Sequence, residues 1–346
     1  MNSVAPFIAE GVRARPLPSG HRPHRLVLVR LHAFGDTVAV LPVLGALAAR
    51  FPDCRLEVVT GPDSAELFQG RADVAAVHIL DARAGRAGKL RALAGLAARL
   101  RRRRPDAILD LQRSRLSRAL TLLTGSQAHA AFDRFAPRHG LDRYLDAAEA
   151  LGLGRLAPVL APCLRPELAE RAAALLDGGG HRGEPLVCLN PAGGWPTKQW
   201  ALERYAELGR RLHAELGARL LLLGAGAQGE RVSALAEPLG TAALDLVGRT
   251  TPGLAMALVA RASLMVSDDS ALMHLAWVQG VPTLALFGAT RATWCRPLGE
   301  RAAGFYSEDL PCGACMSAVC ARGDVHCLDR VSVDDALARA RTLLTR

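Results

Sequence analysis

Polar side chains gather in residues 264–280, LMVSDDSALMHLAWVQG, where an apolar strand is followed by a helix. The run SDDS predicts the N-terminal cap of that helix. The first backbone N–H groups of a helix are unpaired and lie at its positive end, so they can bind phosphate. Ser270 and His274 are four residues apart and share one helix face, which brings a hydroxyl and an imidazole to the same place. A plain cap with a structural histidine is the alternative interpretation.

A carboxylate follows the first apolar strand of the chain. The segment RLVLVRL, residues 25–31, predicts a buried strand, and residues 37–50 repeat apolar side chains at helical spacing. Asp36 then stands at a helix N-terminus just beyond a strand end, the edge where ligands bind in open α/β sheets. Its carboxylate can cap the helix or act as a general base.

Lysine is rare in this chain. Of 43 Lys and Arg residues, only Lys89 and Lys198 are lysines. Lys198 lies in NPAGGWPTKQW, a glycine-containing loop between the predicted strand 186–190 and the predicted helix 200–216. A lysine is a compact, strongly hydrated charge, so this position suits a phosphate group. A solvated loop lysine is the alternative.

Three arginines follow the predicted strand 107–111. Arg113, Arg115 and Arg118 are therefore expected at the same edge as Asp36, where they can meet an anionic substrate. Ordinary surface charge is the alternative.

Strands and helices alternate twice along the chain, which predicts an α/β protein with two Rossmann-like domains. We expect residues 1–24 to form a basic, disordered tail and residues 25–160 the first domain. Prolines between 158 and 166 mark a linker, and residues 161–330 form the second domain. A C-terminal helix is expected over 331–346. Two α/β domains in tandem create a deep cleft, which is a common place for a substrate.

Four segments together resemble glycosyltransferase family 9, the heptosyltransferases of lipopolysaccharide core assembly. They are RLHAFGDTVAVLPVLGALAARFP, NPAGGWPTKQW, DLVGRTTPGLAMALVARASLMVSDDSALMHLA and GVPTLALFGATRATWCRPLG. The resemblance implies a GT-B fold, in which two Rossmann-like domains face one another across the cleft. The acceptor binds in the N-terminal domain and the nucleotide-sugar in the C-terminal domain.

The resemblance also implies a reaction. This is inverting transfer of a heptose or related sugar from a nucleotide-sugar, ADP-heptose, to a lipopolysaccharide core or another cell-surface glycan, with no cofactor required for catalysis. By position, Asp36 corresponds to the base, Lys198 to the residue that neutralises the departing phosphate, and Arg113, Arg115 and Arg118 are placed for the acceptor. The donor-binding turn corresponds to Asp269, Ser270, Ala271 and His274. Another GT-B enzyme such as an epimerase, or a non-catalytic glycan-binding GT-B protein, is the alternative.

The sequence departs from the family's pattern in three places. Ala271 replaces the glycine that lets the backbone approach phosphate closely. The acidic residue that contacts the ribose is replaced by Gln228, with Glu230 two positions later. The N-terminal tail is longer than the family requires.

Four of the eight cysteines fall in one short segment. Cys312, Cys315, Cys320 and Cys327 follow the predicted strand 283–287, which we take as the last strand of the sheet. This spacing suits a tetrahedral thiolate site for zinc or iron, and free thiols are the alternative. Such a metal would be structural, with no catalytic role.

Composition limits the partners. The net charge of +10 is compatible with an anionic glycolipid, a nucleotide-sugar or nucleic acid. Only 4% of residues are aromatic, so base-stacking platforms are not expected and we predict no nucleic-acid partner. No apolar run suggests a membrane span or a signal peptide. We expect a cytoplasmic protein with peripheral contact at the anionic inner membrane.

Overall fold

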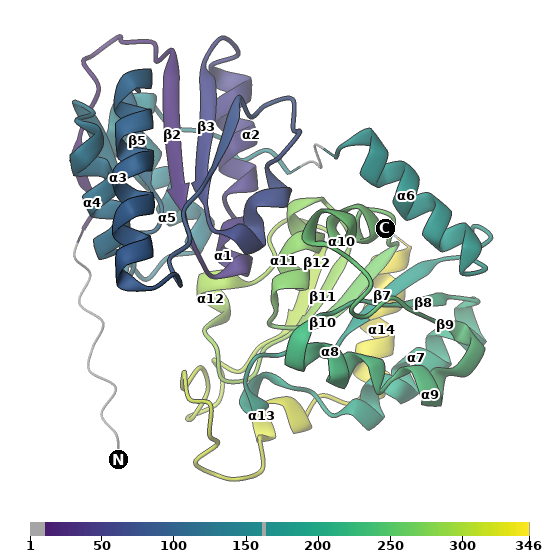
Figure 1. Ribbon diagram of the computed structural model, residues 1–346. Helices are drawn as coiled ribbons and strands as arrows, with labels where there is room; N and C mark the ends of the chain where they lie inside the picture. The colour runs from purple at the N-terminus through teal and green to yellow at the C-terminus, as the bar shows by residue number, and fades with distance from the viewer. Residues whose placement is uncertain (1–10, 161–163, 346) are drawn as a thin grey trace. The chain divides into compact units, whose positions relative to one another are not determined.

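The computed structural model describes residues 11–160 and 164–345 (Figure 1). The chain divides into two compact units, residues 1–159 and 160–346. Each unit is built on one six-stranded sheet with helices on both faces. Within the described residues, no helix is both long and apolar enough to cross a bilayer.

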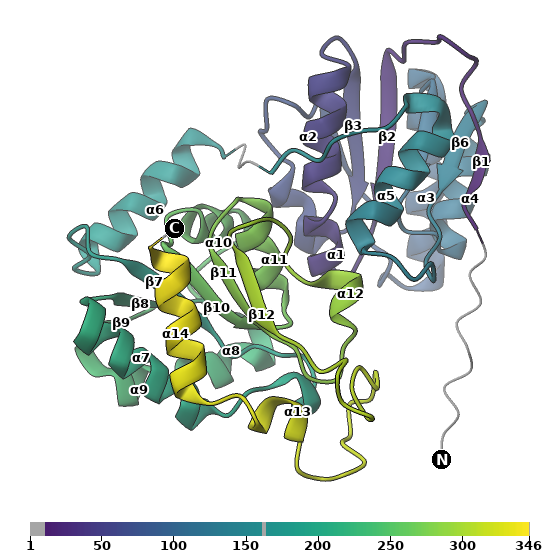
Figure 2. The ribbon, with the colours of Figure 1, turned by 180° about the vertical axis from the view of Figure 1, so that it is seen from behind.

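The N-terminal sheet has the strand order β1-β6-β5-β2-β3-β4, and all its pairings are parallel except that of β1 with β6. Helices α3 and α4 cover one face (Figure 1), and α2 and α5 cover the other (Figure 2). Central strand β2 is buried because both its faces are covered, which explains its continuous apolar run. The elements are β1 Arg13–Arg15, β2 Arg25–Arg30, α1 Phe34–Val38, α2 Leu41–Arg50, β3 Arg55–Thr60, β4 Ala76–Ile79, α3 Arg86–Arg103, β5 Ala107–Asp110, α4 Arg115–Thr124, β6 Ala128–Ala131 and α5 Gly140–Ala148.

The prediction of a disordered tail is wrong for part of residues 11–24. Strand β1 pairs antiparallel with the edge strand β6. Leu17 is buried, and its backbone N–H donates to the carbonyl of Leu151 at 2.9 Å. The three side chains of β1 are all exposed, so this strand depends on backbone pairing and leaves no apolar alternation in the sequence. The rest of the predicted tail, residues 1–10, lies outside the described residues.

The predicted helix 37–50 is two helices. The first, α1, begins after Ala33, which has a left-handed φ of 59°, and ends at Val38. A turn through Val40 then leads into α2, where Pro42 takes a first-turn position that needs no N–H donor.

The C-terminal sheet is parallel throughout, in the order β12-β11-β10-β7-β8-β9. Helices α7 and α14 pack against each other on the face turned toward the viewer in Figure 2, while α10 and α11 lie on the other face. The elements are α6 Pro166–Gly178, β7 Leu186–Asn190, α7 Leu202–Leu216, β8 Arg219–Leu222, α8 Gly226–Ser233, α9 Ala236–Leu239, β9 Ala243–Asp245, α10 Pro252–Val259, β10 Leu264–Asp268, α11 Ala271–Val278, β11 Thr283–Leu286, α12 Ala292–Cys295, β12 Ala302–Phe305, α13 His326–Asp329 and α14 Val333–Leu344.

Two strands of this sheet, β9 and β12, were not predicted from the sequence. The segment 283–286 is not the last strand, because β12 follows it and pairs with it in parallel. β12 reads AAGF, is only half-buried, and lies at the sheet edge, so it lacks the apolar run of a central strand. The cysteine segment therefore comes after β12.

Candidate active site

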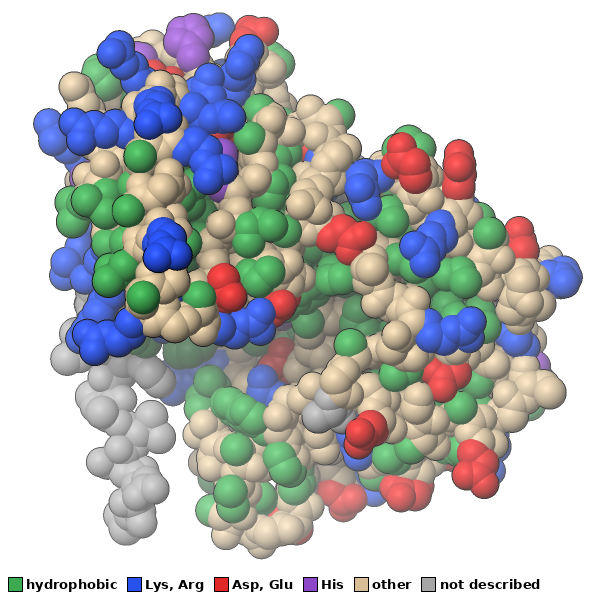
Figure 3. Space-filling model, in the orientation of Figure 1, with side chains coloured by type: hydrophobic (Ala, Val, Ile, Leu, Met, Phe, Trp, Pro, Cys, Tyr) green, Lys and Arg blue, Asp and Glu red, His purple; other side chains and the backbone are tan. Residues whose placement is uncertain are grey.

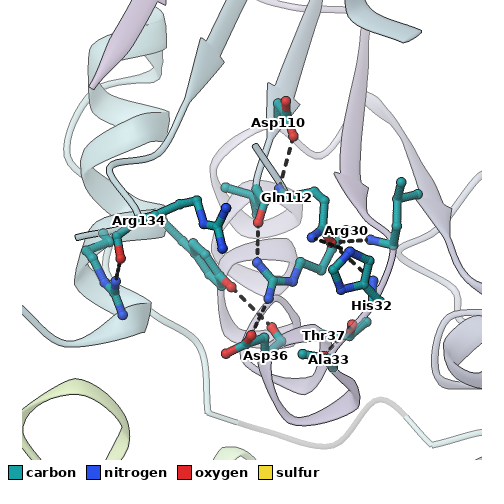
Figure 4. A network of polar contacts seen from close by, with 12 residues as sticks. Arg30, His32, Ala33, Asp36, Thr37, Asp110, Gln112 and Arg134 are labelled. Carbon is teal, nitrogen blue, oxygen red and sulfur yellow. Dashed lines mark hydrogen bonds and ion pairs between the residues drawn. The ribbon is translucent and has the colours of Figure 1, made fainter. Parts of the chain in front are cut away.

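Asp36 lies in the first turn of α1, directly beyond the carboxyl end of β2. Its side chain is 56% exposed, and its Oδ2 accepts an ion-paired hydrogen bond from Nη2 of Arg30, the last residue of β2 (Figure 4). Among the described residues, no hydrogen bond to its other oxygen, Oδ1, is present. One oxygen is thus fixed by the protein and the other is available to a ligand.

Arg30 is an unusual support because it is only 5% exposed. Its Nη1 donates to the carbonyl oxygen of Leu111 at 2.6 Å. Its guanidinium lies 6.0 Å from the ring centroid of Phe132 and 5.8 Å from that of Tyr144. A cation held between two rings and a carbonyl has little freedom, so it fixes the direction of the Asp36 carboxylate.

Gln112 ties the ends of β2 and β5 together beside this pair. Its Oε1 accepts from the N–H groups of Leu31 at 2.9 Å and His32 at 3.1 Å, and its Nε2 lies 3.0 Å from Nε2 of His32. Burial lowers the pKa of His32, and the charges of Arg30 and Arg134 lower it further. The imidazole of His32 is therefore neutral near pH 7. Figure 4 shows Asp36 in the same network of polar contacts.

Asp110 shapes the turn that leads into α4. Its Oδ1 accepts from the N–H groups of Gln112 at 3.0 Å and Arg113 at 2.8 Å, and its Oδ2 accepts from the Ser117 hydroxyl at 2.9 Å. Burial raises the pKa of Asp110, although these donors oppose the shift. Donors of the protein itself occupy both oxygens of this carboxylate, so its role is structural.

The three predicted acceptor arginines fall into two classes. Arg113 is 3% exposed, and its Nη1 donates to the carbonyls of Gly11 and Phe132. It ties the chain near residue 11 to the end of β6, and it is too buried to meet an acceptor. Arg115 and Arg118 are exposed on the first turn of α4.

A cavity of about 400 Å³ lies at the carboxyl ends of β2, β3 and β4, next to α1. It is lined by residues 31–34, 61–64 and 81–83. It includes His32 and two exposed carboxylates, Asp63 and Asp81, that pair with Arg83. The N-terminal unit thus has space for a polar ligand beside Asp36.

The C-terminal unit brings Lys198 and Asp269 together. Nζ of Lys198 donates to Oδ2 of Asp269 at 2.8 Å, and the two side chains are 17% and 8% exposed. The Thr290 hydroxyl donates to the same oxygen at 2.8 Å. Nζ also lies 4.6 Å from the ring centroid of Trp195. Lys198 is therefore a held, partly buried cation, unlike a solvated loop lysine.

Ser270 is the N-cap of α11, as predicted. Its Oγ accepts from the N–H of Met273 at 3.4 Å and from Nδ2 of Asn190, the last residue of β7, at 2.5 Å. Asn190 also donates to the hydroxyl of Ser267 at 2.8 Å, so it joins the ends of β7 and β10. Ala271 follows as the first residue of the helix.

His274 lies one turn into α11 and is half-buried. Its Nδ1 accepts a hydrogen bond from the indole N–H of Trp277 at 2.9 Å. In a neutral imidazole this leaves Nε2 as the protonated nitrogen. Nε2 is then a hydrogen-bond donor on the first turn of this helix.

Asp268, next to Asp269 in sequence, holds the loop that carries Lys198. It is fully buried, and its carboxylate accepts from the N–H of Gly193 at 3.3 Å, the N–H of Trp200 at 3.2 Å and the hydroxyl of Tyr205 at 3.0 Å. The two backbone donors stand on either side of Lys198 in the chain. A Cβ on Gly193 would lie 2.6 Å from the carbonyl oxygen of Lys198, so only glycine fits this fold of the loop.

Gln228 and Glu230 are exposed on α8. The helix is connected to the lysine loop by Arg231, which donates to the carbonyls of Pro191 at 2.9 Å and Trp200 at 2.6 Å. Gln228 and Glu230 thus lie on a helix that is hydrogen-bonded to the loop. Among the described residues, neither side chain forms a hydrogen bond with Lys198.

The cysteine segment packs against the same loop. The Thr197 hydroxyl donates to the carbonyl oxygen of Ser317 at 2.6 Å. The backbone N–H groups of the turn that follows Cys320 lower the pKa of its thiol, although burial opposes this shift. Burial raises the pKa of Cys327, and the neighbouring thiols raise it further. Within the described residues, however, no three His, Cys, Asp or Glu side chains converge into a metal-binding group.

Several residues of these two sites were not identified from the sequence. Arg30 and Asn190 close predicted strands, where they read as ordinary strand ends, and Asp268 reads as part of a cap. Arg134 was missed because no motif marks it, although its charge acts on His32 and its side chain reaches the same network (Figure 4). An unexpected polar residue at the last position of an apolar strand was the available signal for the first two.

Asp268 predicts a pH dependence of stability. Burial raises its pKa to about 7, against about 3.9 in an unfolded chain. Between these values the folded protein keeps a proton that the unfolded chain releases, so this group's stabilisation is complete below about pH 4 and is lost as the pH rises through about 7. The free energy of unfolding of the wild type, measured relative to Asp268→Asn by urea denaturation, should fall by on the order of 3 kcal/mol from pH 4 to pH 7. A difference that stays constant over this range contradicts the assignment.

Known proteins are similar to this chain in sequence and in fold. The family model described as glycosyltransferase family 9 (heptosyltransferase) matches residues 93–326. Lipopolysaccharide heptosyltransferase 1 of Pseudomonas aeruginosa is 29% identical over 315 residues, which cover 86% of this chain and 87% of the relative.

Two solved structures resemble the chain closely. A family 9 glycosyltransferase from Veillonella parvula has a TM-score of 0.81 and 21% identity, covering 93% of this chain and 97% of its own. The E. coli ADP-heptose lipopolysaccharide heptosyltransferase II has a TM-score of 0.74 and 20% identity, covering 93% of this chain and 98% of its own. The family match covers more than half of the chain, including most of the C-terminal unit, and the two sheets agree with the GT-B fold. The chain belongs to glycosyltransferase family 9 and is a glycosyltransferase.

Proposed function

We propose that this protein transfers a heptose, or a related sugar, from ADP-heptose to a lipopolysaccharide core acceptor, with inversion at the anomeric carbon. Family membership and the relative named lipopolysaccharide heptosyltransferase 1 support this reaction over an epimerase or a non-catalytic glycan-binding protein. The observation that carries the proposal is the Lys198–Asp269 pair beside the N-terminus of α11. It supplies a fixed cation and free backbone N–H groups at one place, which suits the diphosphate of a nucleotide-sugar.

In the proposed reaction, an acceptor hydroxyl attacks the anomeric carbon while Asp36 takes its proton. The bond from that carbon to the diphosphate oxygen breaks, and the nucleoside diphosphate departs with the electron pair. No cofactor is needed for this step, because Lys198 and the amides at the start of α11 stabilise the charge that develops on the leaving group. Asp269 orients Lys198 and occupies one of its three N–H donors, so the other two can reach phosphate oxygens.

The remaining site residues have supporting roles in this proposal. Ser270, Ala271 and His274 bind the diphosphate, and Gln228 or Glu230 on α8 meets the ribose. On the acceptor side, Arg115 and Arg118 are the exposed cations of α4, and Arg134 adds a third. An acceptor that carries negative charge suits these three arginines. The protein would act in the cytoplasm, in peripheral contact with the inner membrane.

We also propose that Cys312, Cys315, Cys320 and Cys327 hold a structural zinc or iron ion. The support is their spacing, which suits a tetrahedral thiolate site.

The base assignment predicts a large loss of rate. Asp36→Asn keeps the shape of the side chain but cannot accept the proton, so the transfer rate should fall by about 10²-fold or more while donor binding persists. The matched control is Asp53→Asn, an exposed carboxylate in the turn between α2 and β3 at the other end of the sheet, which should stay within about threefold of the wild type. Near wild-type turnover in Asp36→Asn would remove this residue as the base.

The donor assignment predicts weaker nucleotide binding without Lys198. Lys198→Ala should weaken ADP binding by about 1 to 3 kcal/mol, the range for a lost charge-assisted hydrogen bond, and should lower turnover further. Calorimetric titration of ADP measures this difference. Lys89→Ala, which removes the other lysine of the chain, is the matched control and should bind ADP like the wild type. Equal affinities and rates for both variants would show that Lys198 is not at the diphosphate.

The metal proposal predicts about one zinc or iron ion per chain in freshly purified, reduced protein. Cys315→Ser should lower both the metal content and the melting temperature. Cys54→Ser, which changes a cysteine of the N-terminal unit, is the control and should not lower the metal content. Elemental analysis that finds no metal in the wild type would rule the site out.

A further inference from the structure

Helices α3 and α4 form a surface with a strong charge bias. α3 reads RAGKLRALAGLAARLRRR and α4 reads RLSRALTLLT, and neither contains an acidic residue. Figure 3 shows Lys and Arg side chains spread over this face of the N-terminal unit, with hydrophobic side chains between them. We call the exposed residues of these two helices the α3–α4 face. The C-terminal ends of these helices lie at the edge of the sheet opposite to Asp36, whereas Arg115 and Arg118 at the start of α4 lie at the Asp36 edge.

The charges of this face are mostly not neutralised by the protein. Arg103 pairs with the buried Glu57 at 3.1 Å. Among the described residues, no acidic side chain forms an ion pair with the exposed Arg99, Arg101 or Arg102. Side chains that carry charge without a local partner raise the potential of a surface, and such a potential attracts a polyanion.

A depression of about 1030 Å³ lies where the C-terminal ends of the two helices meet. Arg15, His21, Arg101, Arg102 and Arg104 line it. The carboxylate in its wall, Asp106, accepts from the N–H groups of His24 and Arg25 at 2.7 Å each and lies 3.5 Å from Nε2 of His21. That carboxylate is therefore already paired, and the depression remains a cationic site that suits phosphate groups.

Large hydrophobic side chains are exposed on the same helices. Leu122 is 75% exposed and Leu123 is 51% exposed in the last turn of α4, and Leu90 is 66% exposed in the second turn of α3. The two leucines of α4 stand directly before Thr124 and Gly125, which line the depression. Apolar side chains beside unpaired arginines suit a bilayer, because leucine enters the acyl boundary while arginine binds the headgroup phosphates.

We propose that the α3–α4 face binds an anionic lipid bilayer, with lipid phosphates seated in the depression lined by Arg15, Arg101, Arg102 and Arg104. This inference rests on the proposed peripheral contact with the inner membrane and names the surface that makes it. Nucleic acid shares the phosphate chemistry but gains nothing from exposed leucines, and the face carries no aromatic side chain for a base to stack on.

The test measures co-sedimentation of the full chain with vesicles of phosphatidylcholine, with and without phosphatidylglycerol. The wild type should bind only the anionic vesicles. Arg101→Glu/Arg102→Glu should weaken this binding by about tenfold or more, because each arginine near an anionic surface contributes about fivefold. The matched control, Arg171→Glu/Arg261→Glu, makes the same charge change at exposed arginines of the C-terminal unit and should bind like the wild type.

A second pair of variants separates a bilayer from other phosphate sources. Leu122→Ser/Leu123→Ser should weaken vesicle binding severalfold while leaving any binding of duplex DNA unchanged. Arg101→Gln/Arg102→Gln repeats the charge test if the glutamate variant has a lowered melting temperature. The proposal is overturned if the wild type binds neutral vesicles equally, if the C-terminal control loses as much binding, if the serine variant binds vesicles like the wild type, or if DNA at equal phosphate concentration binds more tightly than vesicles.

Discussion

The donor side of this protein depends on two adjacent buried carboxylates that hold different parts of one loop. Asp268 is fully buried and fixes the loop through Gly193 and Trp200, while Asp269, the residue directly after β10, is 8% exposed and fixes Lys198 itself. A flexible lysine loses entropy when it binds phosphate, and a lysine that is already oriented loses less. The pair therefore gives a fixed cation at the start of α11, where the helix dipole also favours an anion.

In the N-terminal unit, a buried charged group also orients the charged group of the site, but the signs of the two charges are reversed. There the buried ion is the cation Arg30, and the exposed ion is the carboxylate Asp36. Two aromatic rings and a carbonyl hold Arg30 away from water, which fixes its position, while water still screens its attraction to the half-exposed Asp36. In both units, a polar residue at the last position of a buried strand orients the group that the reaction would use.

Local pattern was enough to place the strand ends, and with them Asp36, Lys198 and Ser270, because parallel strands place their following residues at one sheet edge. It could not find partnerships between strands distant in sequence, such as Asn190 with Ser270 or Arg30 with Leu111, since these depend on which strands are neighbours. The local pattern also placed Arg113 with the exposed arginines. Its burial depends on two carbonyls and one carboxylate from other parts of the chain, and the spacing of residues does not reveal such partners. The β1 and β12 edge strands were missed because backbone pairing, not apolar alternation, defines them.

The central claim is that the β10–α11 junction with Lys198 binds the donor diphosphate. A crystal structure of the protein with ADP tests it most directly. The account predicts phosphate oxygens within about 3 Å of Lys198 Nζ and of the first backbone N–H groups of α11, with the His274 imidazole as a further donor. A diphosphate bound elsewhere, with the Lys198–Asp269 pair unaltered and no phosphate at α11, would contradict it.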